Sequence, residues 1–327
     1  MKSTRVISDF PMRKATCAMR QQHAGFTLVE LMVALVLGLI VVGGVISVLL
    51  SNQQSYRTNQ ALSQLQDNSR TAFELLARDI RQAGSTPCGN TEVTSILNGT
   101  AGTVWYQWVD GAGIQGVDNA TTLVPALAAA AAQPAIVTRG VGLVSPTMIT
   151  PAQPCSTGIP LPSAPAEIAA NDLVMACDGE QAYIFQTQAF GGGLLRPVTA
   201  GTPGNNLGLA TCGSFANTAY IAPYNADAWY VAPAGAGAPA GMLSLYRAHY
   251  LGGALRSDEI IRGVIGLQIS YLVDGGAGFV NAASVAGAWT TVSAVQVALT
   301  LRSVTNPNNA AQPEPLVRTF TTTIDVR

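Results

Sequence analysis

The stretch GFTLVELMVALVLGLIVVGGVISVLL, residues 25–50, decides how this chain is organised. Its last 20 residues, Leu31 to Leu50, carry no charge. As an α-helix they would span about 30 Å, the thickness of the hydrocarbon core of a membrane. Glu30 lies directly before this run. A carboxylate at the edge of a membrane-spanning segment is costly unless a neighbouring group compensates its charge, so Glu30 requires an explanation.

Charged residues are divided unevenly on either side of Gly25. Both lysines and three arginines precede it against one acidic residue, whereas the chain after it carries 12 Arg and 17 Asp or Glu. Basic residues before a membrane-spanning helix indicate a cytoplasmic N-terminus and export of the chain after Leu50. The acidic balance of the exported part argues against a nucleic-acid-binding surface.

Three interpretations of the apolar segment are open. A cleaved secretory signal normally has an apolar core of about 7–15 residues that ends at a small-x-small site, and this run is longer. A plain signal anchor accounts for the span but gives Glu30 no role. Cleavage between Gly25 and Phe26 would create an α-amino group four residues before Glu30. Because these positions share one face of a helix, amine and carboxylate could neutralise each other within one chain or between neighbours.

The hexapeptide GFTLVE (25–30), followed by an apolar helix and preceded by a basic leader, resembles the class III signal of type IV prepilins and pseudopilins. This resemblance implies cleavage after Gly25 by a prepilin peptidase and N-methylation of Phe26. It also implies that Glu30 pairs with the Phe26 amine of an adjacent subunit and so sets axial register during assembly.

The leader of 25 residues is long for that family. Translation from Met12 or Met19 would shorten it, and a start at Met19 would leave the seven residues MRQQHAG. We therefore expect the true start to lie after Met1.

Residues 51–84 predict a continuation of the helix as a polar rod with one apolar stripe. Gly84 and Pro87 predict where the helix ends. The stripe is expected to pack on the chain's own globular domain, and a coiled-coil seam is the alternative. Its members follow spacings of three and four residues: Tyr56, Leu62, Leu65, Phe73, Leu76 and Ile80.

Residues 85–327 predict an exported β-rich domain, because the chain as a whole combines 33 Gly and 18 Pro with a low content of charge. Segments 263–273, 292–302 and 318–327 alternate with period two, which indicates strands with one buried face. The turn-rich segment 306–315 joins the last two as a predicted antiparallel pair. In 263–273 the predicted buried face holds Ile265, Leu267, Ile269, Tyr271 and Val273.

Shorter strands are expected at 103–109, 172–177, 182–187 and 243–247. Runs of small residues at 127–134, 231–241 and 275–288 predict surface loops.

The exported part contains four cysteines, Cys88, Cys155, Cys177 and Cys212. An even number in an oxidising compartment predicts two disulfides with three possible connectivities, and free buried thiols are the alternative. Closeness in sequence favours Cys177–Cys212, which leaves Cys88–Cys155.

No catalytic motif is evident in the sequence. His249, the only histidine after Gly25, cannot alone form a zinc site or a facial triad, and its flanks lack a nucleophile elbow. The acidic pairs Asp258–Glu259 and Asp178/Glu180 are candidates for calcium, but hard cations need several converging oxygens, so solvated edges are favoured. We expect no enzyme activity, no cofactor and no metal.

Five later blocks resemble PilW-like minor pilins, whereas the central loops match no family. The blocks are TAFELLARDIRQAG (71–84), NDLVMACDGEQAYIFQT (171–187), LYRAHYLGGALRSDEIIRGVIGLQISYLVDG (245–275), VSAVQVALTLRS (292–303) and VRTFTTTIDVR (317–327). This resemblance implies an α+β, pilin-like fold, in which a long N-terminal helix with a membrane-embedded first half packs on a mainly antiparallel β-sheet head.

The expected organisation is a cleaved leader at 1–25, a transmembrane assembly helix at 26–50, its amphipathic continuation at 51–84 and the exported domain at 85–327. The resemblance implies a minor pilin that primes type IV pilus assembly and sits at the pilus tip. It is expected in the inner membrane, with a cytoplasmic N-terminus and a periplasmic head, and then in the extracellular pilus.

The implied partners are a prepilin peptidase, other minor pilins, the major pilin, inner-membrane lipid and a tip adhesin. Two other functions stay open: a minor pseudopilin of a type II secretion system, and a membrane-anchored periplasmic binding protein or enzyme.

Overall fold

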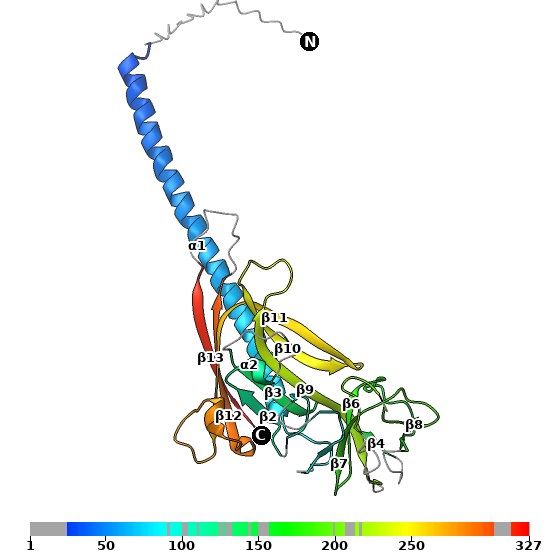
Figure 1. Ribbon diagram of the computed structural model, residues 1–327. Helices are drawn as coiled ribbons and strands as arrows, with labels where there is room; N and C mark the ends of the chain where they lie inside the picture. The colour runs from blue at the N-terminus through cyan, green and yellow to red at the C-terminus, as the bar shows by residue number, and fades with distance from the viewer. Residues whose placement is uncertain are drawn as a thin grey trace, which may run out of the picture. The chain divides into compact units, whose positions relative to one another are not determined.

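The structure is a computed structural model of the chain (Figure 1). It describes residues 25–89, 92–99, 104–109, 111–123, 127, 133–142, 145–149, 157–198, 200–206, 213–215, 218–303 and 315–326. The chain forms two compact units, Met1–Tyr56 and Arg57–Arg327. The division between them falls inside the first helix.

Helix α1 runs from Leu28 to Gln82, which is 55 residues and about 82 Å of helix. Its helical hydrogen bonding is uninterrupted across Gly38, Gly43 and Gly44. After Gln82 the chain leaves the helix through Gly84, which has a left-handed φ of +78° that glycine adopts without strain. The predicted end of the helix at Gly84 is therefore confirmed.

The head is built on an eleven-stranded sheet, in which the main path runs β1-β7-β6-β9-β10-β11-β12-β13. Strands β2, β3 and β4 branch from it: β3 pairs with β2 and β9, and β4 with β9. All these pairings are antiparallel except β1 with β7. With α1 against it, the head confirms the predicted α+β architecture (Figure 1).

The strands of this sheet are β1 (Thr94–Ser95), β2 (Ile114–Val117), β3 (Ala135–Val141), β4 (Thr147–Met148), β6 (Leu173–Cys177), β7 (Ala182–Gln186), β9 (Tyr220–Pro233), β10 (Leu243–Leu251), β11 (Ala254–Val273), β12 (Val292–Arg302) and β13 (Val317–Asp325). A separate two-stranded sheet joins β5 (Ile159–Pro160) and β8 (Leu194–Leu195). Short helical segments are α2 (Ala120–Leu123), α3 (Ala282–Val285) and η3 (Trp289–Thr291).

The apolar stripe of α1 forms one side of the main core. Leu65, Leu76 and Ile80 are 2%, 4% and 0% exposed, and they pack with inward residues of β9 to β13. The stripe therefore packs on the chain's own head from Leu65 onward, as predicted, whereas Tyr56 is exposed. Burying three such aliphatic side chains stabilises the docked helix by roughly 1.5–3 kcal/mol each.

The end of α1 is tied to β3 through the backbone. The Gly84 N–H donates to the Arg139 carbonyl at 2.7 Å, and the Val141 N–H donates to the Ser85 carbonyl at 3.1 Å. The Ser85 hydroxyl donates back to the Val141 carbonyl at 2.8 Å. A Cβ on Gly113 would lie 1.8 Å from the Gly84 nitrogen, so this approach requires glycine at position 113.

The predicted strands 172–177, 182–187 and 243–247 are confirmed as β6, β7 and β10, and the antiparallel pairing of β12 with β13 is confirmed. The segment 306–315 that would join them lies almost wholly outside the described residues, as does most of the predicted loop 127–134. Of the predicted loop 231–241, the first three residues belong to β9.

Three predictions about the sheet are wrong. Residues 104–109 form turns and not a strand, although Trp105 and Trp108 are buried. Ile265 is 41% exposed, because a register shift between Val264 and Gly266 moves Val264 into the core instead. The predicted loop 275–288 contains α3 and buries Val285 against the main core.

A disulfide joins Cys88, just after α1, to Cys177 at the end of β6. Their Cα atoms are 6.0 Å apart and 89 residues apart in sequence. The favoured pairings Cys177–Cys212 and Cys88–Cys155 are therefore wrong, because sheet topology rather than sequence distance brings these cysteines together. Cys155 and Cys212 lie outside the described residues.

Replacing both Cys88 and Cys177 with Ser should lower the free energy of unfolding by about 4–5 kcal/mol, because the link closes a long loop. Urea denaturation of the purified protein measures this loss. Peptide mapping without reduction should find the Cys88 and Cys177 peptides joined in the unaltered protein. A linkage of Cys177 to Cys212 would contradict the structure.

Candidate functional site

The first turn of α1 carries the residues predicted to act in assembly. The Thr27 hydroxyl oxygen accepts the Glu30 backbone N–H at 3.3 Å, and the Thr27 carbonyl accepts the Leu31 N–H at 3.2 Å. Thr27 is thus the N-cap and Glu30 the third helical residue, the positions of a Thr-x-x-Glu capping box. An acid here is also favoured by the helix dipole. The sequence reasoning missed this capping-box spacing of Thr27 and Glu30.

Gly25 and Phe26 precede the helix in irregular backbone. The Phe26 side chain is 81% exposed, and no atom of the described residues lies within 4 Å of the position that a Cβ on Gly25 would take. The peptide bond between them is therefore outside the helical hydrogen-bond ladder and sterically open, as a protease substrate must be.

The first half of α1 exposes apolar side chains on all sides. Every residue from Leu28 to Leu50 is exposed, and α1 is the one helix within the described residues that is long and apolar enough to cross a membrane. Glu30 lies at one end of a shallow apolar groove along this helix, which Phe26, Leu31 and Leu35 also line. Such a surface requires lipid or other apolar helices to cover it.

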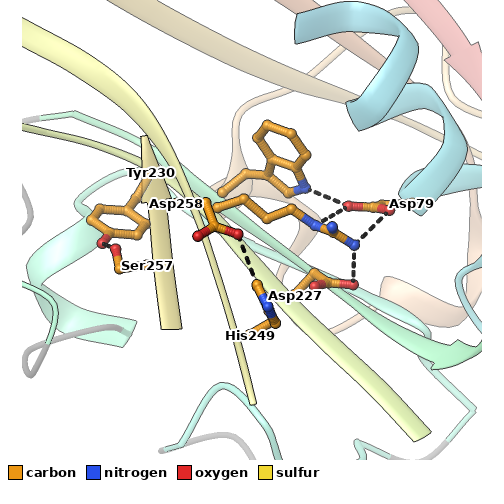
Figure 2. Close-up of polar contacts among 8 residues, drawn as sticks. Asp79, Asp227, Tyr230, His249, Ser257 and Asp258 are labelled. Atoms are coloured by element: carbon orange, nitrogen blue, oxygen red, sulfur yellow. Dashed lines mark hydrogen bonds and ion pairs between the residues drawn. The ribbon is translucent and has the colours of Figure 1, made fainter. Parts of the chain in front are cut away.

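A second group of polar residues lies where the last turns of α1 dock on the sheet (Figure 2). We call Asp79, Asp227, Trp229 and Arg247 the stem–head cluster. Asp79 accepts the Trp229 indole N–H at 2.9 Å and Arg247 Nη2 at 3.1 Å. Arg247 Nε lies 2.9 Å from Asp79 Oδ2, and its Nη2 lies 3.1 Å from Asp227 Oδ2. One guanidinium thus bridges carboxylates from α1 and β9.

Burial dominates the electrostatics of this cluster. It raises the pKa of Asp227 to about 7, with a further increase from the Asp79 charge, while Arg247 opposes the shift. Burial also raises the pKa of Asp79 against the opposing effects of Arg247 and Trp229. Loss of solvent and the Arg247 charge lower the pKa of His249, which Asp258 at 3.8 Å partly opposes.

The sequence reasoning did not single out the stem–head cluster. Asp79 falls three residues after Leu76 and directly before Ile80, inside the apolar stripe of the helical segment 51–84. A carboxylate in a stripe that packs on a core is expected to find a cation or a hydrogen-bond donor there. That position is the signal that could have revealed the cluster.

The acidic pairs considered for calcium do not converge. Asp258 faces His249, whereas Glu259 binds Arg262 at 2.8 Å. Asp178 Oδ1 accepts the backbone N–H groups of Glu180 and Gln181 and so closes a turn. Across the ranges that the structure describes, no three His, Cys, Asp or Glu side chains gather as a metal site.

Comparison with known families gives two matches. Residues 20–46 match the prokaryotic N-terminal methylation motif, and residues 228–326 match the type IV pilus-assembly protein W family. No curated protein and no solved structure matches the chain. The two resemblances stated from the sequence are thus confirmed within the matched residues. The first match contains Gly25, Phe26 and Glu30, and the second contains Trp229 and Arg247. The blocks at 71–84 and 171–187 lie outside the second match.

These matches support a minor pilin role within pilus assembly and point to a structural rather than a catalytic protein. The methylation motif with one apolar helix fits a membrane-anchored pilin, and the pilus-assembly match suggests contacts with other pilins and the assembly machinery.

Arg247→Met should destabilise the head by about 3–5 kcal/mol, because it leaves two buried carboxylates without their cation. Arg262→Met is the matched control, since it removes an arginine from an exposed ion pair with Glu259 and should cost at most about 1 kcal/mol. Urea unfolding of both variants measures the difference. Equal losses would mean that Arg247 adds no more than a surface ion pair.

Proposed function

We propose that this chain is a minor pilin that primes assembly of a type IV pilus and takes a position at the pilus tip. The observation that carries this proposal is the union, in one chain, of a prepilin motif on an exposed apolar helix with a PilW-like sheet. A type II secretion pseudopilin would also have the prepilin motif on an apolar helix. The match of residues 228–326 to a pilus-assembly family favours a pilus protein over a pseudopilin.

Processing is the first step of this function. A prepilin peptidase cleaves the bond between Gly25 and Phe26, which removes the leader 1–25, and the new Phe26 amine is N-methylated. The amine remains basic after methylation and keeps its positive charge. Support comes from the open, non-helical backbone at this bond and the exposed Phe26 side chain.

Lateral association is the second step. The helix 26–50 packs beside the helices of other minor pilins and the major pilin, which cover its apolar surface. Glu30 pairs with the Phe26 amine of an adjacent subunit. Because the pair forms where water is scarce, its attraction is stronger than it would be in bulk water. A slip by one helical turn, about 5.4 Å, would separate the charges, so the pair sets axial register.

The proposed arrangement places 26–50 in the inner membrane and 51–84 with 85–327 in the periplasm. The N-terminus faces the cytoplasm, where the basic leader remains until cleavage. Assembly then carries the head out with the pilus, and a tip adhesin is a further proposed partner of the head.

Glu30→Gln should abolish surface pili while the protein still reaches the membrane, because it removes the charge at nearly constant shape. Thr27→Val is the matched control: it removes the helix cap and keeps the acid, so pili should still form. Electron microscopy counts the pili, and immunoblots of membrane fractions show insertion. Normal piliation with Glu30→Gln would exclude the proposed charge pairing.

A further inference from the structure

An acid buried within an apolar helix-docking surface needs a specific reason. Asp79 is 6% exposed, although Leu76 and Ile80 beside it belong to the main core. Apolar side chains at such positions dock a helix without the cost of removing charges from water. The stem–head cluster around Asp79 is therefore expected to have a role other than packing the helix on the sheet.

The charged and titratable groups around Asp79 come from every element that meets there. Helix α1 contributes Asp79 and, on its exposed side, Arg78; β9 contributes Asp227, with the buried Tyr224 nearby. Strand β3 contributes the buried Arg139, which lines a small cavity together with Asp79 and Asp227. The other strands contribute Arg247 and His249 from β10, and Arg256 and Asp258 from β11.

At the centre, two buried carboxylates share one guanidinium. Arg247 Nη2 lies 3.1 Å from Asp79 Oδ1 and 3.1 Å from Asp227 Oδ2, so those two oxygens are at most 6.2 Å apart. The Asp79 and Asp227 side chains are 5% and 7% exposed, whereas Arg247 is 29% exposed. With both acids ionised, this group of three carries one uncompensated negative charge in a water-poor site.

We propose that Asp79, Asp227 and Arg247 form a proton-dependent latch that holds the end of α1 on the sheet when the two carboxylates share one proton. The proton makes the group of three neutral and allows both acids to contact Arg247 without mutual repulsion. Loss of the proton weakens the attachment of α1, because the excess charge is then confined between the helix and β9.

The direction in which detachment of α1 from the sheet, here called opening, depends on pH follows from proton linkage. Burial raises the pKa of Asp227 to about 7 in the docked state, against an ordinary value near 3.9 in a solvated chain. Between these values the docked state holds a proton that the open state has released. Opening therefore becomes more favourable as pH rises through this window, by at most about tenfold per pH unit, and levels off above pH ~7.

His249 acts in the opposite direction. Its pKa is lowered in the docked state by burial and by Arg247, so docking strengthens as pH rises through the ordinary histidine range. Any test must separate these two titrations. Asp258 is exposed enough to serve as a control acid, since its side chain is 61% exposed.

Hydrogen exchange of the full-length protein in detergent micelles, followed by mass spectrometry, tests the latch. The opening constant of the peptide covering 72–83 is measured from pH 5 to pH 8 after correction for intrinsic exchange rates, with a β12 peptide as an internal reference. In His249→Gln the opening constant should increase between pH 5 and 7 by close to tenfold per pH unit. In the unaltered protein the opposing titration of His249 should make this increase smaller.

Three further variants are made in the His249→Gln background, so that His249 no longer titrates. In that background the pH dependence of the opening constant should vanish in Asp227→Asn, whose amide oxygen can still accept from Arg247 but does not titrate in this range. Asp79→Asn should move the rise in the opening constant to lower pH, because the Asp79 charge no longer adds to the burial that raises the pKa of Asp227. This variant provides a second route if Asp227→Asn fails to fold. Asp258→Asn should retain the pH dependence.

Three outcomes would overturn the proposal. The first is a flat or falling opening constant between pH 5 and 7 in His249→Gln. The second is an unchanged pH dependence in the foldable Asp227 or Asp79 variant. The third is an equal pH dependence of the opening constant in the β12 reference peptide. This result would mean that the proton affects global unfolding and not specifically the attachment of α1.

Discussion

The constraint on which the structure depends is that one helix must satisfy two environments. From Leu28 to Leu50 no side chain is buried by the residues that the structure describes. A helix that is apolar on all sides is stable only in lipid or among other helices. From Leu65 onward a single stripe is buried on the sheet of the head. The head thus supplies a partner for the second half of α1, and the proposed pilin neighbours and membrane supply one for the first.

Each of these two environments contains an acidic residue of α1. Asp79 lies where the helix docks on the sheet, and Arg247 supplies its cation from β10. Glu30 lies at the start of the apolar half, and in the part of the chain that the structure describes no basic group forms an ion pair with it. The same physical rule, that a carboxylate away from water needs a positive partner, is met within the chain at Asp79. At Glu30 it leads to the proposed pairing between subunits.

Local patterns in the sequence predict the helices and strands that have one buried face and one exposed face. Alternation along 292–302 and the last strand predicts two antiparallel neighbours, and the spacing from Leu65 to Ile80 predicts the docked stripe. Strand β9 was missed because much of it is buried on both faces, which removes the alternation. The exposed Ile265 depends on a bulge. The Cys88–Cys177 link and the bridge that Arg247 makes between Asp79 and Asp227 depend on pairings between distant segments, which no local period encodes.

The most direct test of the central claim is mass spectrometry of the N-terminal peptide of the protein isolated from its native membrane or pilus. The proposed processing predicts that this peptide begins with N-methylated Phe26, followed by Thr27, Leu28, Val29 and Glu30. A mature chain that retains residues before Phe26, or that begins at any later residue, would contradict the account, because no ammonium would then lie one helical turn from the Glu30 carboxylate.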